Sequence, residues 1–451
     1  MLDLAQYQIA GSTARDIASS IEASIREGLL ETGGQLPTVR GLAQSLGTSP
    51  ATVNAAYRIL RQRGLVVGEG RRGTRVAPRP AVRPTIGTAR PVSAPGLPEG
   101  VRDLTIGLPD PELLLPIQPA LQRIDIEARM RISGLESVDP DLLELAAESF
   151  RADGLPADSI AVMAGAFDGI ERVLQAHLRP GDRVLIEDPA YTSTRDILLA
   201  LGLVAVPVPV DELGFLPEPF EARLAQGVEA VVMVPRAQNP FGSALDPERS
   251  ALLQTLIAEH PEVVIVEDDH AGVVSGAPFS TIVTPTARRW AVIRSTSKVL
   301  HPDLRVALMA GDATTIARVE GRQALGTRWV SHVLQAIVVE LLSDPGFADS
   351  ARRARDAYAS RRESLIEALA AREVRAHGRS GLNVWVPVRE EAPVVGALLD
   401  TGWLVMAGEH FRMQTPPGVR ITISTLTEDE PDAIADVVAA VEHAGRPRRA
   451  Y

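Results

Sequence analysis

Ser295-Thr296-Ser297-Lys298 follows an apolar run, and Arg305 stands seven residues beyond the lysine. A lysine that holds an aldehyde cofactor needs nearby hydroxyl groups and an arginine for a phosphate, and Ser295, Ser297 and Arg305 supply them at suitable spacing. Lys298 is also the one lysine among 46 basic residues, all others being arginine. Because lysine forms a Schiff base and arginine does not, this position is the first candidate for covalent chemistry.

Polar groups also follow several apolar runs upstream of this lysine. Val263–Glu267 reads as a buried strand, and a carboxylate at its end, Asp268, can pair with a protonated pyridine nitrogen. Taken singly, such groups are more often solvated strand ends, turns, helix starts and packed core residues. Three more candidates lie upstream. The Asn239 amide can bond a ring hydroxyl, Tyr191 can stack on a ring, and Gly165-Ala166-Phe167 begins a helix whose N–H groups can bind phosphate.

The order of apolar runs and longer helical stretches predicts the fold class of residues 103–451. Alternating strands and helices favour a mostly parallel sheet with helices on both faces, followed by a small C-terminal α+β lobe. The predicted strands are Arg183–Glu187, Leu203–Val208, Ala230–Val234, Val263–Glu267, Ala291–Ile293 and Val306–Ala310.

Together these motifs resemble the fold-type I pyridoxal-phosphate enzymes, the aspartate aminotransferase group, over about residues 103–446. The resemblance implies pyridoxal 5′-phosphate as cofactor, with Lys298 as the catalytic Schiff-base lysine and Asp268 as the pyridine partner. It implies that Asn239 contacts the ring hydroxyl and Tyr191 stacks on the ring. Arg420 matches the arginine that pairs with a substrate carboxylate. The phosphate would be held by Gly165, Ala166, Ser295, Ser297 and Arg305, with Phe167 beside it.

Residues 1–76 predict a winged helix-turn-helix. Amphipathic spacing indicates a helix over 13–29, and a second helix runs from about Thr38 to a turn at Gly47. Ser49 and Pro50 suit the start of a third helix, which ends at Gly64. Two short β segments, Leu65-Val66-Val67 and Thr74-Arg75-Val76, flank a basic turn that forms the wing.

This segment resembles the GntR family of bacterial regulators in an ordered set of motifs: Leu36-Pro37-Thr38-Val39-Arg40, Leu42–Gly47, Thr52–Tyr57 and Arg63-Gly64-Leu65-Val66. A helix that enters the major groove needs small or polar residues at its N-terminal end, and arginines can reach phosphates. The alternative is a small helical adaptor with a solvated basic face. The predicted DNA contacts are Arg40, Thr48, Ser49, Thr52, Asn54, Tyr57, Arg71 and Arg72.

Charge and composition separate the two parts of the chain. Residues 1–90 hold twelve arginines against six acidic residues, whereas the whole chain has a net charge of −11. Between the parts, residues 77–102 contain six prolines and read as a semi-rigid linker. The absence of cysteine excludes disulfides and thiolate metal sites, and we expect no metal site. With no signal peptide and no apolar run of membrane-spanning length, we expect a cytoplasmic protein without membrane contact.

Both halves together resemble the MocR subfamily of GntR regulators. This implies a homodimeric transcription regulator that binds paired half-sites on duplex DNA and senses an amino compound or the B6 vitamer itself. The alternative is a catalytically active aminotransferase with an accessory DNA-binding head. Two positions depart from the subfamily pattern: His270 replaces the usual tyrosine near the ring, and Phe241 replaces a common threonine. His270 is equally open to a cofactor-binding and to a packing role.

Overall fold

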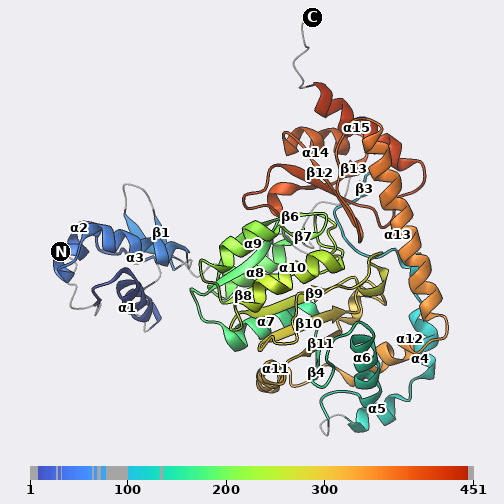
Figure 1. The fold of residues 1–451 in the computed structure, drawn as a ribbon, viewed down its shortest axis with the longest axis horizontal. Helices are drawn as coiled ribbons and strands as arrows, with labels where there is room; N and C mark the ends of the chain where they lie inside the picture. Colours follow the sequence, from blue (N-terminus) through green and yellow to red (C-terminus); the bar gives the residue numbers. More distant parts are fainter. Residues whose placement is uncertain are drawn as a thin grey trace, which may run out of the picture. The chain divides into compact units, whose positions relative to one another are not determined.

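A computed structural model describes residues 9–26, 29–31, 33–62, 65–68, 73–77, 100–132 and 136–444 (Figure 1). The chain divides into two compact units. The helices among the described residues are too short or too polar to cross a membrane.

The N-terminal unit has the predicted order of three helices and a hairpin. Thr38 caps the start of the second helix, because its Oγ1 accepts a hydrogen bond from the Gly41 N–H. Gly47, in the left-handed conformation (φ 63°), ends this helix. Ser49 Oγ accepts the N–H of Thr52 at 3.0 Å and so caps the third helix, as predicted. The elements are α1 (Ala14–Arg26), α2 (Val39–Leu46), α3 (Pro50–Gln62), β1 (Val66–Gly68) and β2 (Thr74–Val76).

Apolar faces of these elements form one small core. Ile17 and Ile21 of α1 are fully buried together with Val53 and Leu60 of α3. The predicted extension of the first helix to Leu29 is wrong, since α1 ends at Arg26 and the Leu29 side chain is 38% exposed. The hairpin is antiparallel, and its buried residues Val66 and Val76 belong to the same core.

The larger unit is built on an eight-stranded sheet in the order β4-β11-β10-β9-β8-β5-β6-β7. Its centre, β10-β9-β8-β5, is parallel, whereas β11 and β4 at one edge and β7 at the other pair antiparallel. The sheet is therefore mixed, with a parallel centre. Its strands are β4 (Ile160–Met163), β5 (Arg183–Asp188), β6 (Val204–Asp211), β7 (Gly214–Phe215), β8 (Ala230–Met233), β9 (Val264–Asp269), β10 (Trp290–Ser295) and β11 (Ala307–Gly311).

Helices cover this sheet. Helix α7 packs against β9, β10 and β11, while α12 packs against α4, α5 and α6. The helices are α4 (Ile117–Arg123), α5 (Ile126–Ile132), α6 (Pro140–Ala152), α7 (Ala166–His177), α8 (Thr192–Ala200), α9 (Pro217–Leu224), α10 (Pro247–Ala258), α11 (Ala313–Leu325) and α12 (His332–Leu342), with short 3-10 turns η3 (Pro111–Leu113), η4 (Gly272–Val274) and η5 (Pro302–Leu304).

The C-terminal lobe has its own core around a three-stranded antiparallel sheet, β12-β15-β14. Residues from the start of the larger unit also join this lobe. Strand β3 (Arg102–Asp103) pairs with β13 (Trp403–Leu404), and the segment that follows, residues 104–108, leads toward the large sheet. The remaining elements are α13 (Phe347–Ala370), β12 (Asn383–Pro387), α14 (Glu391–Asp400), β14 (Met406–Ala407), η6 (Gly408–His410), β15 (Gly418–Thr422) and α15 (Glu430–Ala444).

Candidate functional site

A cavity of about 690 Å³ lies where the parallel strands β8, β9 and β10 end. This edge of an open α/β sheet is the usual place for a ligand, because the strand ends and the following loops converge there. The predicted residues that line the cavity are Ala166, Phe167, Tyr191, Asn239, Asp268, His270, Ser295, Ser297, Lys298, Arg305 and Arg420. Gly165 directly precedes the lining residue Ala166.

Lys298 follows β10 after the turn that begins at Ser295. Its Nζ donates a hydrogen bond to the main-chain oxygen of Gly107. Burial, with the positive charges of Arg420 and Arg305, lowers the pKa of Lys298 to about 8. A larger fraction of this amine is therefore neutral at pH 7 than for an exposed lysine, which suits attack on an aldehyde carbon.

Three polar atoms of the cavity residues are buried without a hydrogen-bond partner: Asp268 Oδ1, Ser297 Oγ and Arg420 Nε. Burial, together with the charge of Asp269, raises the pKa of Asp268 to about 7, while Lys298 opposes the rise. A cationic N–H donor would satisfy Asp268, and a phosphate oxygen would satisfy Ser297. These donors and acceptors fit the pyridine nitrogen and the phosphate of pyridoxal phosphate.

The other phosphate-binding candidates converge at the start of α7. Gly165 adopts φ 99°, and a Cβ at this position would collide with the guanidinium of Arg305. Glycine therefore lets Arg305 approach the N-terminal turn of α7, where free backbone N–H groups already favour an anion. Ser295 Oγ, at the end of β10, accepts the Ser297 N–H at 3.2 Å in the turn that leads to Lys298.

Asn239 and Arg420 contact each other in the wall of the cavity. Arg420 Nη1 donates to Asn239 Oδ1 at 3.1 Å, and its Nη2 donates to the main-chain oxygen of Thr105. The guanidinium carbon lies 4.8 Å from the centre of the Phe411 ring, and Nε is buried without a partner. Because Asn239 Oδ1 is engaged as an acceptor, its amide nitrogen is left to donate to a ligand.

Tyr191 and Phe167 form an aromatic pair at the cavity wall. Their ring centres are 5.7 Å apart and their planes are inclined by 30°. Both side chains are only partly buried, so they offer apolar surface to a ligand. This arrangement is compatible with the stacking role predicted for Tyr191.

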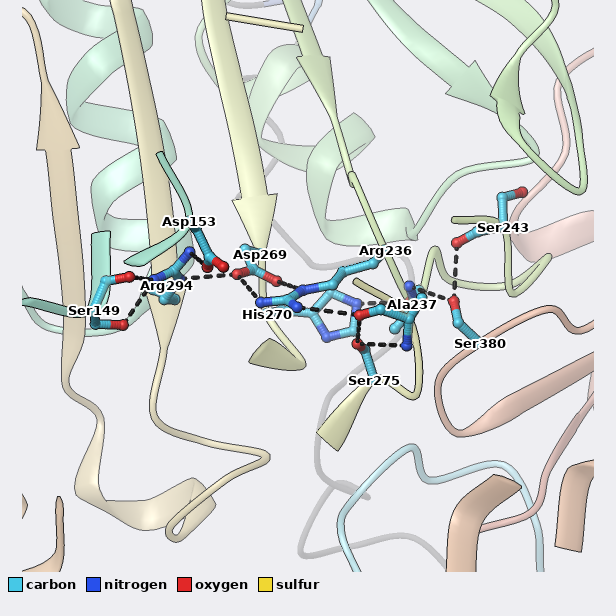
Figure 2. Close-up of polar contacts among 11 residues, drawn as sticks. Ser149, Asp153, Arg236, Ala237, Ser243, Asp269, His270, Ser275, Arg294 and Ser380 are labelled. Atoms are coloured by element: carbon cyan, nitrogen blue, oxygen red, sulfur yellow. Dashed lines mark hydrogen bonds and ion pairs between the residues drawn. The ribbon is translucent and has the colours of Figure 1, made fainter. Parts of the chain in front are cut away.

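A second polar network lies next to this cavity, and the sequence reasoning missed it. Asp269 is fully buried and accepts hydrogen bonds from Arg236 and Arg294, and Arg294 also contacts Asp153 and Ser149 (Figure 2). Successive residues of a strand point to opposite faces, which separates Asp269 from the ligand-facing Asp268. The run Glu267-Asp268-Asp269 was the available signal, because three consecutive buried carboxylates require separate partners.

Main-chain groups of residues 105–107 were also missed. Thr105 and Gly107 give their carbonyl oxygens to Arg420 and Lys298, and backbone acceptors carry no side-chain signature in a sequence. Asp103 lines the cavity too, and its carboxylate accepts the N–H of Thr105 at 2.9 Å. Within the described ranges, no group of three or more His, Asp or Glu side chains is placed to hold a metal.

The third helix of the N-terminal unit presents the predicted reading residues. Ser49 and Asn54 are exposed, as is Arg40 in α2, while Thr48 and Thr52 are partly exposed. Ser49 Oγ and Thr52 Oγ1 lie 2.8 Å apart, so the cap and one reading side chain share a hydrogen bond. The predicted contacts Arg71 and Arg72 lie outside the described residues.

The predicted contact of Tyr57 with DNA is wrong. Its side chain is 1% exposed within the core, and its hydroxyl donates to the main-chain oxygen of Pro37 at 2.6 Å. Arg58 and Arg61 are exposed on α3 and were missed. They continue the face of Asn54 at spacings of four and three residues, a periodicity that the sequence alone displays.

Comparisons with known proteins match the two units separately and together. Residues 104–438 match the family of aminotransferase class I and II, and residues 13–76 match the family of bacterial regulatory proteins, gntR. Over 429 residues, the chain is 38% identical to the vitamin B6 salvage pathway transcriptional repressor PtsJ of Salmonella typhimurium, covering 95% of this chain and 98% of the relative.

Two further similarities are lower in identity. The pyridoxine biosynthesis transcriptional regulator PdxR of Corynebacterium glutamicum is 25% identical, over 79% of each chain. The crystal structure of Pyrococcus horikoshii kynurenine aminotransferase in complex with PMP has a TM-score of 0.67 at 20% identity, covering 77% of this chain and 92% of that one. This last likeness concerns the fold alone.

Proposed function

This chain belongs to the MocR-type group of GntR regulators, which join a winged helix to an aminotransferase class I and II domain, and we propose that pyridoxal 5′-phosphate at Lys298 controls its binding to DNA. One observation supports the proposal above the others. The single lysine of the chain lines a cavity in which two of the three unpartnered atoms, Asp268 Oδ1 and Ser297 Oγ, match the pyridine nitrogen and the phosphate.

Each cavity residue then has a role. Lys298 would link covalently to the cofactor, Asp268 would hold the pyridine nitrogen, and Asn239 would donate to the ring hydroxyl. The phosphate would rest on the first turn of α7 with Ser295, Ser297 and Arg305. When bound, pyridoxal phosphate supplies an aldehyde that condenses with amines and a ring that withdraws electrons.

We propose that the B6 vitamer itself is the effector. The relative with 38% identity is described as a repressor of vitamin B6 salvage, and the relative from Corynebacterium glutamicum as a regulator of pyridoxine biosynthesis. Two donors of Arg420 are already bonded to Asn239 and Thr105, which reduces its capacity for a bidentate carboxylate. An amino compound is the second candidate, favoured by the partnerless Arg420 Nε.

A catalytically active aminotransferase remains the alternative function. It is favoured by the combination of Lys298, with its lowered pKa, and a carboxylate for the pyridine nitrogen. Release of a keto acid from an amino acid by the full-length protein would support this alternative, and a spectral response without turnover would support the sensor.

The exposed face of α3 would read DNA in the major groove. Ser49, Thr52 and Asn54 would contact base edges, with Thr48 at the same helix start. Arg40 would contact phosphate, as would Arg58 and Arg61 further along α3. Since helix-turn-helix proteins commonly read paired half-sites, we propose a cytoplasmic homodimer in which the proline-rich residues 77–102 connect each head to its body.

The decisive test measures DNA binding of the full-length protein on its own promoter fragment by fluorescence anisotropy. Pyridoxal 5′-phosphate should change the affinity several-fold, pyridoxal without phosphate should not, and Lys298→Ala should lose the response while retaining basal DNA binding. Borohydride reduction of the wild type should add the cofactor's mass at Lys298. If DNA affinity ignores pyridoxal phosphate but responds to an amino acid, the amino-compound reading replaces this one.

A further inference from the structure

His270 has one defined hydrogen bond. Its Nε2 lies 2.9 Å from the main-chain oxygen of Ala237, and because a carbonyl oxygen can only accept, Nε2 must carry the imidazole proton. Burial and the charge of Lys298 lower the pKa of His270 to about 4, so the ring is neutral at pH 7. Nδ1 therefore holds a lone pair and is the ring nitrogen left for a ligand in the cavity that His270 lines.

The oxygen that fixes this tautomer is itself held in place. Ala237 has a positive φ of 58°, and its N–H donates to Ser380 Oγ at 2.8 Å. Ser380 is fully buried, and its hydroxyl lies 3.2 Å from the main-chain oxygens of Gly242 and Ser243. Ser380 lies between α13 and β12 of the C-terminal lobe, so that lobe determines where the Ala237 peptide points.

A second contact runs parallel to the first. Arg236 precedes Ala237 and Asp269 precedes His270, and these two neighbours form a buried ion pair with both contacts at 2.8 Å (Figure 2). The dipeptides Arg236-Ala237 and Asp269-His270 are thus joined by two contacts, the ion pair and the hydrogen bond of the imidazole. Rotation of the imidazole would break the Ala237 bond without moving the ion pair, so the ion pair holds the backbone while the carbonyl selects the tautomer.

We propose that His270, positioned by Ala237 and Ser380, offers Nδ1 as a hydrogen-bond acceptor to the ring hydroxyl of pyridoxal phosphate and thereby keeps that hydroxyl protonated. The inference rests on the proposed cofactor site. The tyrosine usual at this position in the subfamily has a hydroxyl that can donate to an ionised ring oxygen, whereas a lone pair repels one. The amide nitrogen of Asn239 is a donor to the ring oxygen in either case, so the fraction of the ring oxygen that is protonated depends on residue 270.

The test compares absorption of the full-length holo protein with that of His270→Tyr and His270→Phe. Bound cofactor with a protonated ring oxygen absorbs in the near ultraviolet, and with an ionised one in the visible. A hydrogen bond to a charged group changes an equilibrium constant by about tenfold, so His270→Tyr should raise the visible to near-ultraviolet ratio by about that factor. His270→Phe should give an intermediate ratio; equal ratios in the wild type and His270→Phe would overturn the proposal.

Nitrogen NMR of wild-type protein labelled at its eight histidines gives a second readout. The resonance pair that disappears in His270→Phe and in His270→Asn should show an unprotonated Nδ1 and a protonated Nε2, and the opposite pattern would exclude the acceptor role. Ser380→Ala should move the absorption ratio toward that of His270→Phe, which a purely structural serine would not do. Borohydride mass at Lys298 is measured in parallel: its absence disproves the cofactor site, whereas its presence with unchanged ratios disproves only the role of His270.

Discussion

Arg236 faces Asp269 in a bidentate ion pair, with Nε–Oδ1 and Nη2–Oδ2 both at 2.8 Å and both side chains almost completely buried. Arg294 adds a third hydrogen bond to the same carboxylate at 2.9 Å. Burial alone would raise the pKa of Asp269, but the hydrogen bonds and charges of Arg236 and Arg294 outweigh it and lower the pKa. One carboxylate therefore joins two guanidinium groups beside the candidate site, and Asp153 supplies the second negative charge through Arg294.

Replacing this carboxylate should destabilise the larger unit severely. Asp269→Asn leaves the buried Arg236 without its counter-ion, whereas Arg294 keeps Asp153, and breaking a buried pair in this way costs about 3–5 kcal/mol of unfolding free energy. Urea denaturation followed by tryptophan fluorescence measures the loss. The matched control is Glu262→Gln, which breaks the exposed pairs with Arg288 and Arg289 and should cost less than about 1 kcal/mol. Comparable losses for both variants would contradict the reading.

Glu187 predicts an unusual dependence of stability on pH. Burial raises its pKa to about 8, although hydrogen bonds from the Val234 N–H and the Gln238 side chain partly oppose the rise. Between pH 4.5 and about 8 the folded state holds a proton that the unfolded state has released, so this group's contribution to stability falls as pH rises through that window. Glu187→Gln should flatten this part of the profile.

The measurement is the denaturation midpoint of the cofactor-free protein at several pH values. Glu187→Gln places an amide against that of Gln238, so an overall loss of about 1 kcal/mol is also expected from the lost hydrogen bond. Glu259→Gln on the surface serves as the control for removing a carboxylate. A slope between pH 5 and 8 that is the same in the wild type and Glu187→Gln would exclude Glu187 as its source.

On the DNA-binding unit, Arg58→Ala and Asn54→Ala should separate affinity from sequence preference. Arg58 is placed for a phosphate, so its loss should weaken binding to all sequences and reduce the slope of log affinity against log salt by about 1. Asn54→Ala should relax base preference by about 1–3 kcal/mol at one position. Tyr57→Phe should leave both unchanged and destabilise the unit by about 1 kcal/mol, because Pro37 loses its hydrogen-bond donor.

The strands that carry the site were predictable because their apolar runs are continuous and their polar ends are abrupt. The six predicted strands agree with β5, β6, β8, β9, β10 and β11 to within one to three residues at each end. The short β4 and β7 were not predicted, since two to four residues give no distinct periodicity. Tyr57 shows the converse limit, because an aromatic residue on an amphipathic helix fits a core as well as a DNA contact until its burial is known.

The sequence predicts those parts of the candidate site in which a side chain faces the ligand. It does not predict contacts made by main-chain groups or contacts between residues that are far apart in the chain. Lys298, Asp268 and Asn239 stand at strand ends, and topology alone brings them together. Ser380 lies 143 residues from Ala237, and its hydrogen bond depends on how the C-terminal lobe packs on the sheet. Thr105 and Gly107 contribute carbonyl oxygens, which every residue possesses and no sequence pattern marks.

Arg420 offers the sharpest distinction between the two proposed effectors. It holds Asn239 Oδ1 at 3.1 Å, so Arg420→Ala frees the amide to rotate and should weaken pyridoxal phosphate binding by about tenfold, the value of one charged hydrogen bond. If the vitamer is the effector, saturating pyridoxal phosphate should still produce the full change in DNA affinity in this variant. If an amino acid is the effector, its carboxylate loses Arg420 and no concentration should restore the response.

Thermodynamic reciprocity makes this test complete. Whatever factor the effector imposes on DNA affinity, DNA must impose on effector affinity, because both measure one coupling free energy. Pyridoxal phosphate titrations of Arg420→Ala should therefore show weaker binding than the wild type both with and without promoter DNA. The ratio of the two binding constants should equal the wild-type ratio. Arg412→Ala is the control, since Arg412 pairs with Glu391 at 2.7 Å and does not line the cavity. If the coupling between pyridoxal phosphate and DNA vanishes in Arg420→Ala alone, the prediction that the vitamer response does not need Arg420 is contradicted.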